Sequence, residues 1–559
     1  MDHCIAGVCF VALDGAAPRF FGFAEFLAAL ALMIIVWTTT DTRYRFRIAT
    51  APIPLHHLTF VAVAAVGTLT LLTDLWRAQE WMVPQGHIIT PAVWQAFMGS
   101  VFLLTFLAWA WFAFIRPPRF GRRNARRFGS FLFQKITESS PEEMAILAHE
   151  LNRSIPTLID ASSPLPRHDR SGEQDAALPP IQGVANEILL LIGDPRFCRV
   201  LVASCPGTIH CLFQAIADAE KYQVPVAQFA RNVVSAAIEN RNSFLYHEDE
   251  GYLTGLLGYW KPISQAVFGN YRMAAGIGTL FDGDLRSRRQ WSAAEWAAFN
   301  RAVLITVQSY VATESWNHSS ILARAFGAIE NASSDLYKID GSESGAWGED
   351  SFQRLSASVR FCEDVMKVLD EQGVPDHLHW RIRNSDPVYF RSLYDELVDL
   401  IYELIGHAAA VKQPWDLCWV VQHNTLWSSF FLRLSEDGPA SRIVKFKLRR
   451  KLYDEIVSAS EWQNFQNVKY LGYCLNVMGI EVHQEDFGRS YWPLQKALLA
   501  WTKRHYAALE EKAPQVFENC LPSRLSYDKA NCRLVKTYQP NAFRAEPKQV
   551  FFELDRVPA

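Results

Sequence analysis

The stretch from Thr90 to Arg127 constrains this chain more than any other. Residues 91–115 carry no formal charge, and they are followed at once by a run of arginines. As a helix, an apolar stretch of this length can cross a hydrocarbon layer of about 30 Å. We therefore predict a transmembrane helix that ends at an arginine collar, which consists of Arg116, Arg119, Arg122, Arg123, Arg126 and Arg127.

Two more apolar stretches precede this one. The first covers about residues 20–39, and the second covers about residues 55–76. In the third span, Thr90 is suited to cap the helix and Pro91 to occupy its first position. The sequence thus predicts three transmembrane helices and a membrane anchor over residues 1–127, with the first span retained rather than cleaved as a signal peptide.

The basic residues outside the spans predict the orientation of this anchor. Lys and Arg concentrate in the cytoplasmic loops of membrane proteins. The segment between the first two spans holds three arginines and the third span is followed by the collar, whereas the N-terminal tail and the loop between the second and third spans hold one arginine each. We therefore expect the N-terminus outside and everything after Ile115 in the cytoplasm. We expect a bacterial inner membrane, because no organelle signal is evident.

Charged residues at the membrane leave two functional questions open. Glu25 and Asp74 are ionisable groups within predicted spans, which makes them candidates for a functional site. Both also lie near span ends, where they can reach lipid headgroups. The collar is expected to face anionic lipid, each arginine contributing about 1 kcal/mol near the surface. Its role is either to fix the orientation or to form a specific lipid-regulatory site.

The rest of the chain is predicted to be mainly α-helical. We expect a juxtamembrane helical segment over 128–161, a linker rich in Pro, Ser and charge over 162–182, and a helical cytoplasmic domain over 183–559. Two short strands near the C-terminus, 533–538 and 549–554, predict a small β element.

Two apolar stripes within that domain predict packed helices. Each stripe repeats at alternating spacings of three and four residues. Because each covers fewer than three heptads, we expect an internal face of a helical bundle, with a coiled-coil seam as the alternative. The stripes are Phe352, Leu355, Val359, Cys362, Met366 and Leu369, and Phe390, Leu393, Leu397, Leu400 and Leu404.

The net charge bears on nucleic acid as a partner, and the cysteines bear on the redox state of the thiols. The formal net charge of −3 gives no support for nucleic acid as a partner of the whole chain. Eight of the 10 cysteines fall in the predicted cytoplasmic part without a C-x-x-C pair, which indicates buried thiols. Cys4 and Cys9 fall on the outer side, and the sequence leaves a disulfide between them open.

The best candidate for a chemical site is a short run of polar residues. His247, Glu248 and Glu250 lie beside the aromatic-containing run 251–260, which is suited to wall a pocket. Oxygen ligands that converge would suit a divalent cation, but the spacing matches no recognised metal motif. A solvated loop is the plainer interpretation. The same alternatives apply to two more acidic clusters, at 282–284 and 483–486.

A basic run at 442–451 lies on a predicted helix with an apolar face on its other side. Its basic residues are Arg442, Lys445, Lys447, Arg449, Arg450 and Lys451. A solvated helix face is the first interpretation. Contact with the inner leaflet or with a nucleic acid is the alternative, and the predicted anchor favours lipid.

Three functions are consistent with these patterns. The first is a membrane-anchored cytoplasmic helical module that binds a partner or senses a signal. The second is a membrane-tethered, metal-dependent enzyme. The third is an oligomeric pore or effector subunit whose spans assemble. Membrane lipids, and a protein partner or a second copy of the chain, are the expected partners. The sequence identifies no cofactor and assigns no metal.

Overall fold

The computed structural model confirms a mainly helical chain with a small sheet near the C-terminus. It forms two units, 1–229 and 230–559, and each is described by itself. The described residues are 3–5, 8–12, 19–39, 41–84, 90–164, 179–251, 262–283, 288–313, 318–343, 345–373, 391–432, 438–458, 465–482, 491–539 and 546–556.

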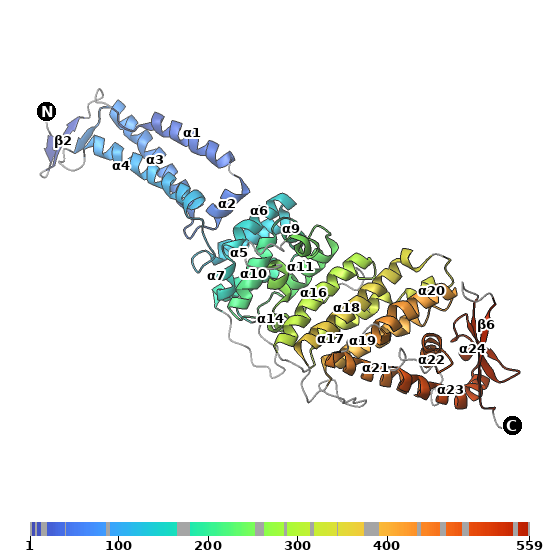
Figure 1. Cartoon of the computed structure of the whole chain (residues 1–559). Coiled ribbons are helices and arrows are strands. Elements are labelled where there is room, and N and C mark those ends of the chain that lie inside the picture. The colour runs from blue at the N-terminus through green and yellow to red at the C-terminus, as the bar shows by residue number, and fades with distance from the viewer. Residues whose placement is uncertain are drawn as a thin grey trace. The chain divides into compact units, whose positions relative to one another are not determined.

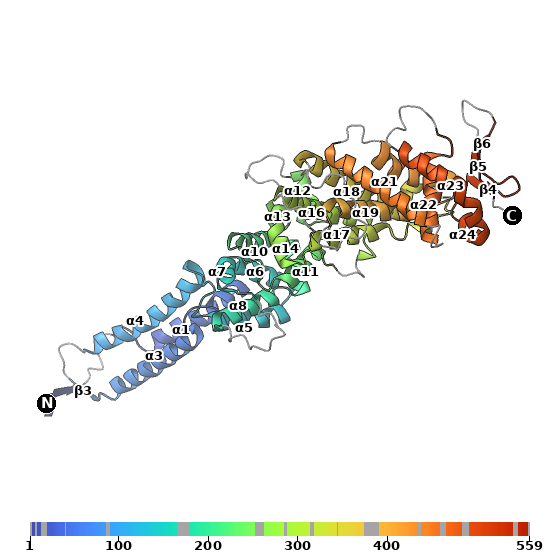
Figure 2. The ribbon, with the colours of Figure 1, turned by 90° about the horizontal axis from the view of Figure 1, so that it is seen from below.

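Three apolar helices lie side by side at the N-terminal end of the first unit (Figures 1 and 2). They are α1 (Phe23–Thr39), α3 (Leu55–Ala78) and α4 (Pro91–Ala110), the last extended by a π-helical turn, η1 (Trp111–Ile115). The helices 55–78 and 91–115 are long and apolar enough to cross a membrane, and α1 adds a shorter apolar helix. The Thr90 hydroxyl accepts a hydrogen bond from the Val93 amide, which confirms the predicted cap.

Close packing holds α1 against α3 and α4. Phe26 of α1, Val66 of α3 and Met98 of α4 form one buried cluster. The Phe26 ring lies over Gly67, where a Cβ atom would come within 2.7 Å of it. A glycine is therefore needed at this point of α3 for the ring to pack.

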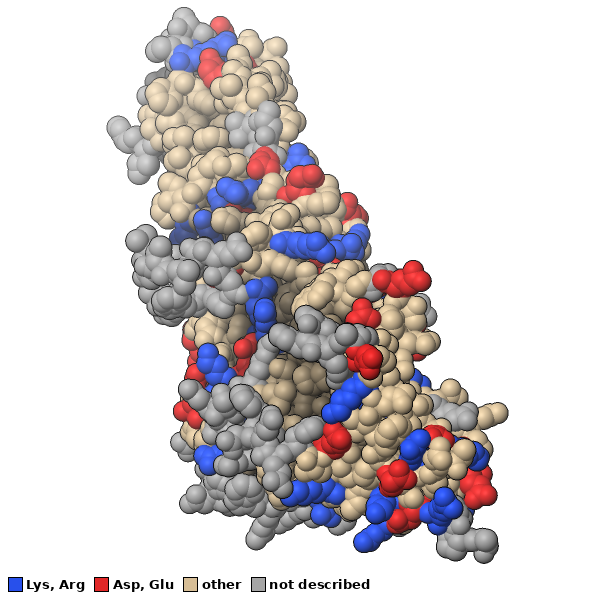
Figure 3. Space-filling view, turned by 45° about the vertical axis from the view of Figure 1, so that its right-hand side comes forward, with Lys and Arg blue, Asp and Glu red and all other residues tan. Residues whose placement is uncertain are grey.

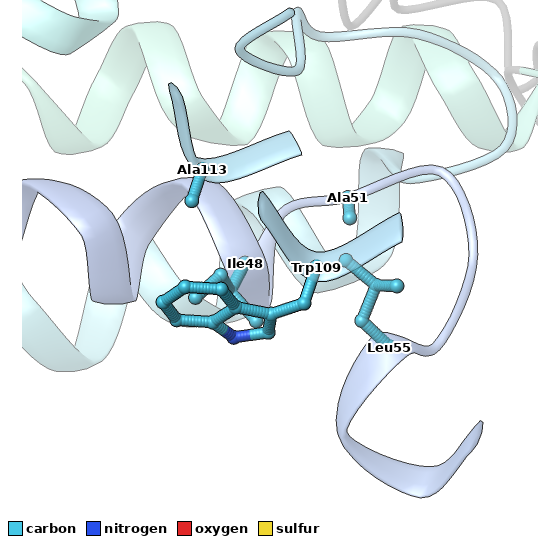
Figure 4. Close-up of a cluster of buried hydrophobic side chains, with 5 residues drawn as sticks. All are labelled: Ile48, Ala51, Leu55, Trp109 and Ala113. Carbon is cyan, nitrogen blue, oxygen red and sulfur yellow. The ribbon is translucent and has the colours of Figure 1, made fainter. Parts of the chain in front are cut away.

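A second cluster joins these helices at the other end. The helix α2 (Thr42–Ala49) fills the segment between α1 and α3, and its Ile48 packs against Trp109 of α4. Figure 4 shows the Trp109 indole lying beside Ile48, with Ala51, Leu55 and Ala113 around it. The segment predicted as a basic loop is thus a packed helix.

A three-stranded antiparallel sheet accompanies the opposite end of the three helices, and it was not predicted. It contains β1 (His3–Ile5), β2 (Val8–Ala12) and β3 (Met82–Pro84), in the order β1-β2-β3. Strand β3 belongs to the connection between α3 and α4, so β2 ties the N-terminal segment to that connection.

Short helices complete the first unit. They are α5 (Ala125–Glu138), α6 (Pro141–Asn152), α7 (Ile155–Ala161), α8 (Pro180–Leu191), α9 (Pro195–Ser204) and α10 (Pro206–Asp218). The predicted start at Ser140 is confirmed, since its hydroxyl accepts from the Glu143 amide. Together α9 and α10 are as apolar as a span, but they are bent by 108° and bury Phe197 and Phe213 in the core of this unit. Most of the predicted linker, 165–178, lies outside the described residues.

The second unit is a helical bundle built around α18 (Asp350–Gln372). Every residue of its predicted apolar stripe is buried, as are Leu393, Leu397, Leu400 and Leu404 of α19 (Leu393–Ala408). The stripes are therefore internal faces, and the coiled-coil alternative is not needed. Phe390 lies outside the described residues. Helix α16 (Ala293–Ala312) begins at the predicted Ser292–Glu295 capping box and packs against α18.

The remaining helices surround these. They are α11 (Ala227–Glu239), which spans the boundary between the units, α12 (Phe244–Gly251), α13 (Pro262–Phe268), α14 (Tyr271–Ile277), α17 (Ser320–Glu330), α20 (Trp415–Trp419), the π-helix η7 (Val420–Leu432), α21 (Pro439–Ser458), α22 (Phe465–Met478), α23 (Trp492–Lys512) and α24 (Pro514–Glu518).

The C-terminal sheet has three antiparallel strands instead of the predicted two. Strand β5 (Arg533–Tyr538) lies between β4 (Leu525–Asp528) and β6 (Lys548–Glu553). Strand β4 is short, and only Leu525 of it is buried, so it carries a weak apolar signal.

A glycine in α22 tests the packing of the second unit. We expect Gly472→Ala to lower the free energy of unfolding by about 1–3 kcal/mol, because the added methyl group would overlap the backbone carbonyl oxygen of Cys520. Gly327→Ala in α17 is the control. Nothing lies within 4 Å of the place that its added methyl group would take, so the alanine is expected to stabilise the helix by about 0.5–1 kcal/mol. Denaturant unfolding in mild detergent, followed by tryptophan fluorescence, measures both, and equal effects would contradict the contact.

Candidate functional site

A belt of exposed apolar side chains surrounds α1, α3 and α4. Phe60 is 73% exposed and Leu32 is 66% exposed. In Figure 3 this belt is the tan zone near the upper end of the molecule, between two groups of charged side chains. A continuous exposed apolar surface on a folded protein indicates contact with lipid or with another protein. The belt includes Leu27, Ile34, Ile35, Leu58, Val61, Leu71, Leu72, Val93, Phe97, Leu103, Leu104 and Leu107.

The arginine collar follows directly on this belt. Five of its members are exposed: Arg116, Arg119, Arg122, Arg123 and Arg126. Arg127 is half-buried and donates a hydrogen bond of 2.8 Å to the carbonyl oxygen of Pro52. One collar residue therefore has a structural contact, and five present guanidinium groups at the surface next to an apolar zone.

A buried ion pair links α2 to the helices after the collar. The Arg47 guanidinium donates from Nε and Nη2 to the two carboxylate oxygens of Glu150, at 2.9 and 2.7 Å. A third hydrogen bond, 2.8 Å long, runs from Nη1 to the carbonyl oxygen of Ala113 in η1, the turn that extends α4. Arg47 is 7% exposed and Glu150 is 3% exposed. We call these three residues the clamp, because they join α2, η1 and α6.

The electrostatics of the clamp favour the charged form of Arg47. The hydrogen bonds to Glu150 raise the pKa of Arg47 above its usual value, and they outweigh the opposing effect of burial. A bidentate pair of this kind is directional as well as strong. It therefore fixes the orientation of α2 on α6 as well as their distance.

Further polar contacts surround the clamp. Thr42 donates to the Glu143 carboxylate at 3.1 Å, and Arg43 lies 3.4 Å from Glu150. The Asn124 amide donates to the carbonyl oxygens of Thr50 and Arg119, at 2.6 and 2.9 Å. The segment between the first two apolar helices is thus held at several points by the helices that follow the third.

Glu25 and Asp74 meet at the opposite end of the three helices. Asp74 accepts a hydrogen bond of 2.9 Å from the Phe23 amide, and Glu25 accepts one of 3.0 Å from the Gly22 amide. The Gln95 side chain accepts from the Phe20 amide. These acceptors satisfy amides at the start of α1, which otherwise have no partner within the helix. Both carboxylates therefore have a local structural role.

The candidate residues at 247–250 lie on α12. The two carboxylate oxygens of Glu248 accept hydrogen bonds of 2.9 Å from the amides of Ile263 and Ser264, at the start of α13. Glu248 is buried, whereas His247 is exposed. The side chain of Glu250 and the adjoining run 252–260 lie outside the described residues. The structure thus gives Glu248 a capping role and does not bring His247 to the same contacts.

The other acidic clusters are described only in part. Asp282 pairs with Arg324 at 3.1 Å, while Asp284 and the cluster 483–486 lie outside the described residues. Within the described ranges, no group of three or more His, Cys, Asp or Glu side chains is placed to hold a metal ion.

Part of the basic run on α21 packs against α19 in the second unit. Lys447 pairs with Asp395, and Lys451 pairs with Asp399, both on α19. Lys445 and Lys447 are buried. The interpretation as a solvated face is wrong for Lys447 and Lys451, because each pairs with an aspartate of α19 that lies 52 residues earlier in the chain. Arg442 and Arg450 are exposed.

A set of half-buried titratable groups beyond these pairs was missed from the sequence. His407 of α19 lies 3.2 Å from the Ser333 hydroxyl, and burial lowers its pKa to about 4. Burial also lowers the pKa of Lys469 and raises that of Glu330. These groups come from different helices, so no local motif reveals them. Perturbed groups of this kind occur both at functional sites and in structural networks.

No protein-family model matches this chain, and no curated protein or solved structure matches it.

The clamp can be tested by removing one charge. We expect Glu150→Gln to lower the free energy of unfolding by about 3–5 kcal/mol, because it leaves a buried guanidinium without its counterion. The control is Arg45→Gln on the same helix, where the side chain is exposed and a change within about 0.5 kcal/mol is expected. Thermal unfolding in mild detergent measures both. The double variant Arg47→Met/Glu150→Met should recover most of the loss, since apolar replacement of a buried pair is often tolerated.

His407 makes the second unit sensitive to acid. The pKa of its imidazole is about 4 in the folded chain, against 6.5 for the ordinary group, so the unfolded chain binds the proton first as pH falls. The free energy of unfolding should therefore be unaffected by this group above pH 6.5 and fall below it, by about 2.5 kcal/mol at pH 4.5. In His407→Gln, the free energy of unfolding should fall less between pH 8 and pH 4.5 than it does in the wild type, as measured by denaturant unfolding at both pH values. An equal fall in the variant and the wild type would refute the effect of burial on His407. The variant His247→Gln controls for the loss of a histidine elsewhere.

Proposed function

We propose that this protein is a membrane-anchored helical module that senses the state of its transmembrane helices and presents a cytoplasmic helical body to a partner. In this proposal α1, α3 and α4 cross the membrane, and the apolar belt contacts lipid tails. The exposed collar arginines then lie at the headgroups of the inner leaflet. The exposed arginines come directly after the apolar belt along the chain, and this order supports the placement.

The contacts at the two ends of the helices support three crossings. At one end, α2 packs on α4 and α6, so the segment after α1 lies with the segment after α4. At the other end, β2 pairs with β3, so the N-terminal segment lies with the connection between α3 and α4. This alternation is what three spans require, with the N-terminus outside and residues after 115 in the cytoplasm.

The short helix α1 is consistent with a span. Its 17 residues give a helix of about 26 Å, at the lower limit for a hydrocarbon core of about 30 Å. A short span is accommodated by local thinning of the bilayer or by neighbouring helices. The length of α1 therefore makes the anchor responsive to bilayer thickness.

The clamp is the observation that carries the sensing function. Arg47 binds both the turn that ends the third apolar helix and the middle of α6. A displacement of α2 or of that turn is therefore passed to α6. Hydrogen-bond and ion-pair networks between structural elements can carry conformational coupling from one site to another. The carboxylates of Glu248, Glu25 and Asp74 accept backbone hydrogen bonds, so these residues lend no support to a metal-dependent enzyme or to an ion path, and we favour the sensing module.

Coupling can be measured by hydrogen exchange of the full chain in nanodiscs of short-chain or long-chain lipid. We expect amide exchange in α6 to differ by about fivefold or more between the two bilayers, which corresponds to a coupling free energy of about 1 kcal/mol. The control is Arg47→Met/Glu150→Met, which removes the clamp without leaving a buried charge. The sensing function would be contradicted if the α6 exchange rates of the wild type were the same in both bilayers. It would also be contradicted if the exchange rates of the double variant differed between the bilayers by as much as those of the wild type.

The orientation is tested separately by cysteine labelling. In a Cys4→Ser/Cys9→Ser background, Gln79→Cys lies in the outer connection and Arg122→Cys lies in the collar. A membrane-impermeant maleimide should label position 79 but not position 122 in sealed right-side-out vesicles, and the reverse in inside-out vesicles. The opposite pattern would overturn the orientation.

A further inference from the structure

The register of the N-terminal strands places two cysteines opposite one another. In the antiparallel pair of β1 and β2, the Cα partners are His3 with Phe10, Cys4 with Cys9, and Ile5 with Val8. The pairing therefore brings together the cysteines that the sequence alone could only assign to the same segment.

The backbone geometry at this position suits a disulfide. Directly opposite residues of an antiparallel pair are either hydrogen-bonded, with Cα atoms about 5.5 Å apart, or non-hydrogen-bonded, with Cα atoms about 4.5 Å apart. Cys4 and Cys9 are directly opposite one another, so one of these two spacings applies to them. Disulfides join Cα atoms about 4.4–6.8 Å apart. Both spacings fall within that range, so the register is compatible with a bond between the two residues.

The other cysteines follow a different pattern. Those in the described part beyond the third span are all free: Cys198, Cys205, Cys211, Cys362, Cys418, Cys474, Cys520 and Cys532. Free thiols are typical of a reducing compartment, whereas disulfides form in compartments outside the cytoplasm. The proposed orientation places Cys4 and Cys9 on the oxidising side and the other eight on the reducing side.

We infer that Cys4 and Cys9 form an intrachain disulfide on the outer face of the membrane. The inference rests on the orientation given in the proposed function. The two thiols lose two protons and two electrons as the S–S bond forms. A protein disulfide of a thiol oxidoreductase accepts the electrons through thiol–disulfide exchange and leaves as a dithiol.

This bond would stabilise the cap over the outer ends of the helices. It joins β1 to β2, and β2 in turn pairs with β3, through Phe10 with Pro84 and Ala12 with Met82. Since β3 lies in the connection between α3 and α4, the disulfide would hold the N-terminal hairpin in register for that pairing.

Peptide mapping of the full-length chain from native membranes tests the bond. Free thiols are alkylated under denaturing conditions and the chain is digested with trypsin, which leaves both cysteines in peptide 1–19. We expect this peptide to carry no alkyl group and to be lighter by two hydrogen atoms, until prior reduction gives the doubly alkylated form. A peptide alkylated twice without reduction, or linked to a second copy, would overturn the intrachain bond.

A second variant separates this inference from the orientation. In Cys4→Ser, the remaining Cys9 should react with a membrane-impermeant maleimide in right-side-out vesicles. If Cys9 reacts from outside while the wild-type peptide proves reduced, the disulfide is refuted and the orientation stands. If Cys9 reacts only after the vesicles are opened, the orientation fails and the disulfide fails with it.

Discussion

The buried pair of Arg47 and Glu150 is the contact on which the arrangement of the N-terminal unit depends. Two charges in a protein interior cost solvation free energy, which the bidentate geometry and the third hydrogen bond to Ala113 offset. Losing either partner is costly, so the pair specifies one docking of α2 on α6. The apolar cluster around Trp109 sits beside this pair and closes the same junction.

Charge is used in a similar way inside the second unit. Asp395 with Lys447 and Asp399 with Lys451 repeat at four-residue spacing on α19 and α21, so the two helices run in register along a ladder of ion pairs. Beyond the ladder, burial shifts the pKa values of His407 and Lys469. Both units therefore combine apolar stripes with ion pairs that define how particular helices align.

Much of the fold could be predicted because its signals are local. The uncharged stretch 91–115, the cap at Thr90 and the stripe on α18 each depend on residues a few positions apart. The missed features depend on distant partners. Arg47 meets Glu150 across 103 residues, and Lys447 meets Asp395 across 52. From the sequence alone, the basic run of α21 is predicted to be solvated, because its acidic partners on α19 are distant in the chain.

The candidate site shows the same division. Its apolar belt and collar follow from composition, whereas the clamp requires the fold. Glu248 was singled out for its carboxylate, but its acceptors are used by the amides of α13, which begins 14 residues later. The sheet β1-β2-β3 was missed because its strands are short and one lies in a loop between apolar helices. Strands this short contain too few residues to show a recognisable alternation of apolar and polar side chains.

Cross-linking between α2 and α6 tests the central claim most directly. Thr42 and Glu143 are joined by a 3.1 Å hydrogen bond between their side chains, whereas Arg45 is exposed on the same helix. In native membranes under a mild oxidant, the variant Thr42→Cys/Glu143→Cys should form an intrachain disulfide, identified by peptide mapping, much faster than Arg45→Cys/Glu143→Cys. Equal rates, or no cross-link in the first variant, would contradict the docking of α2 on α6.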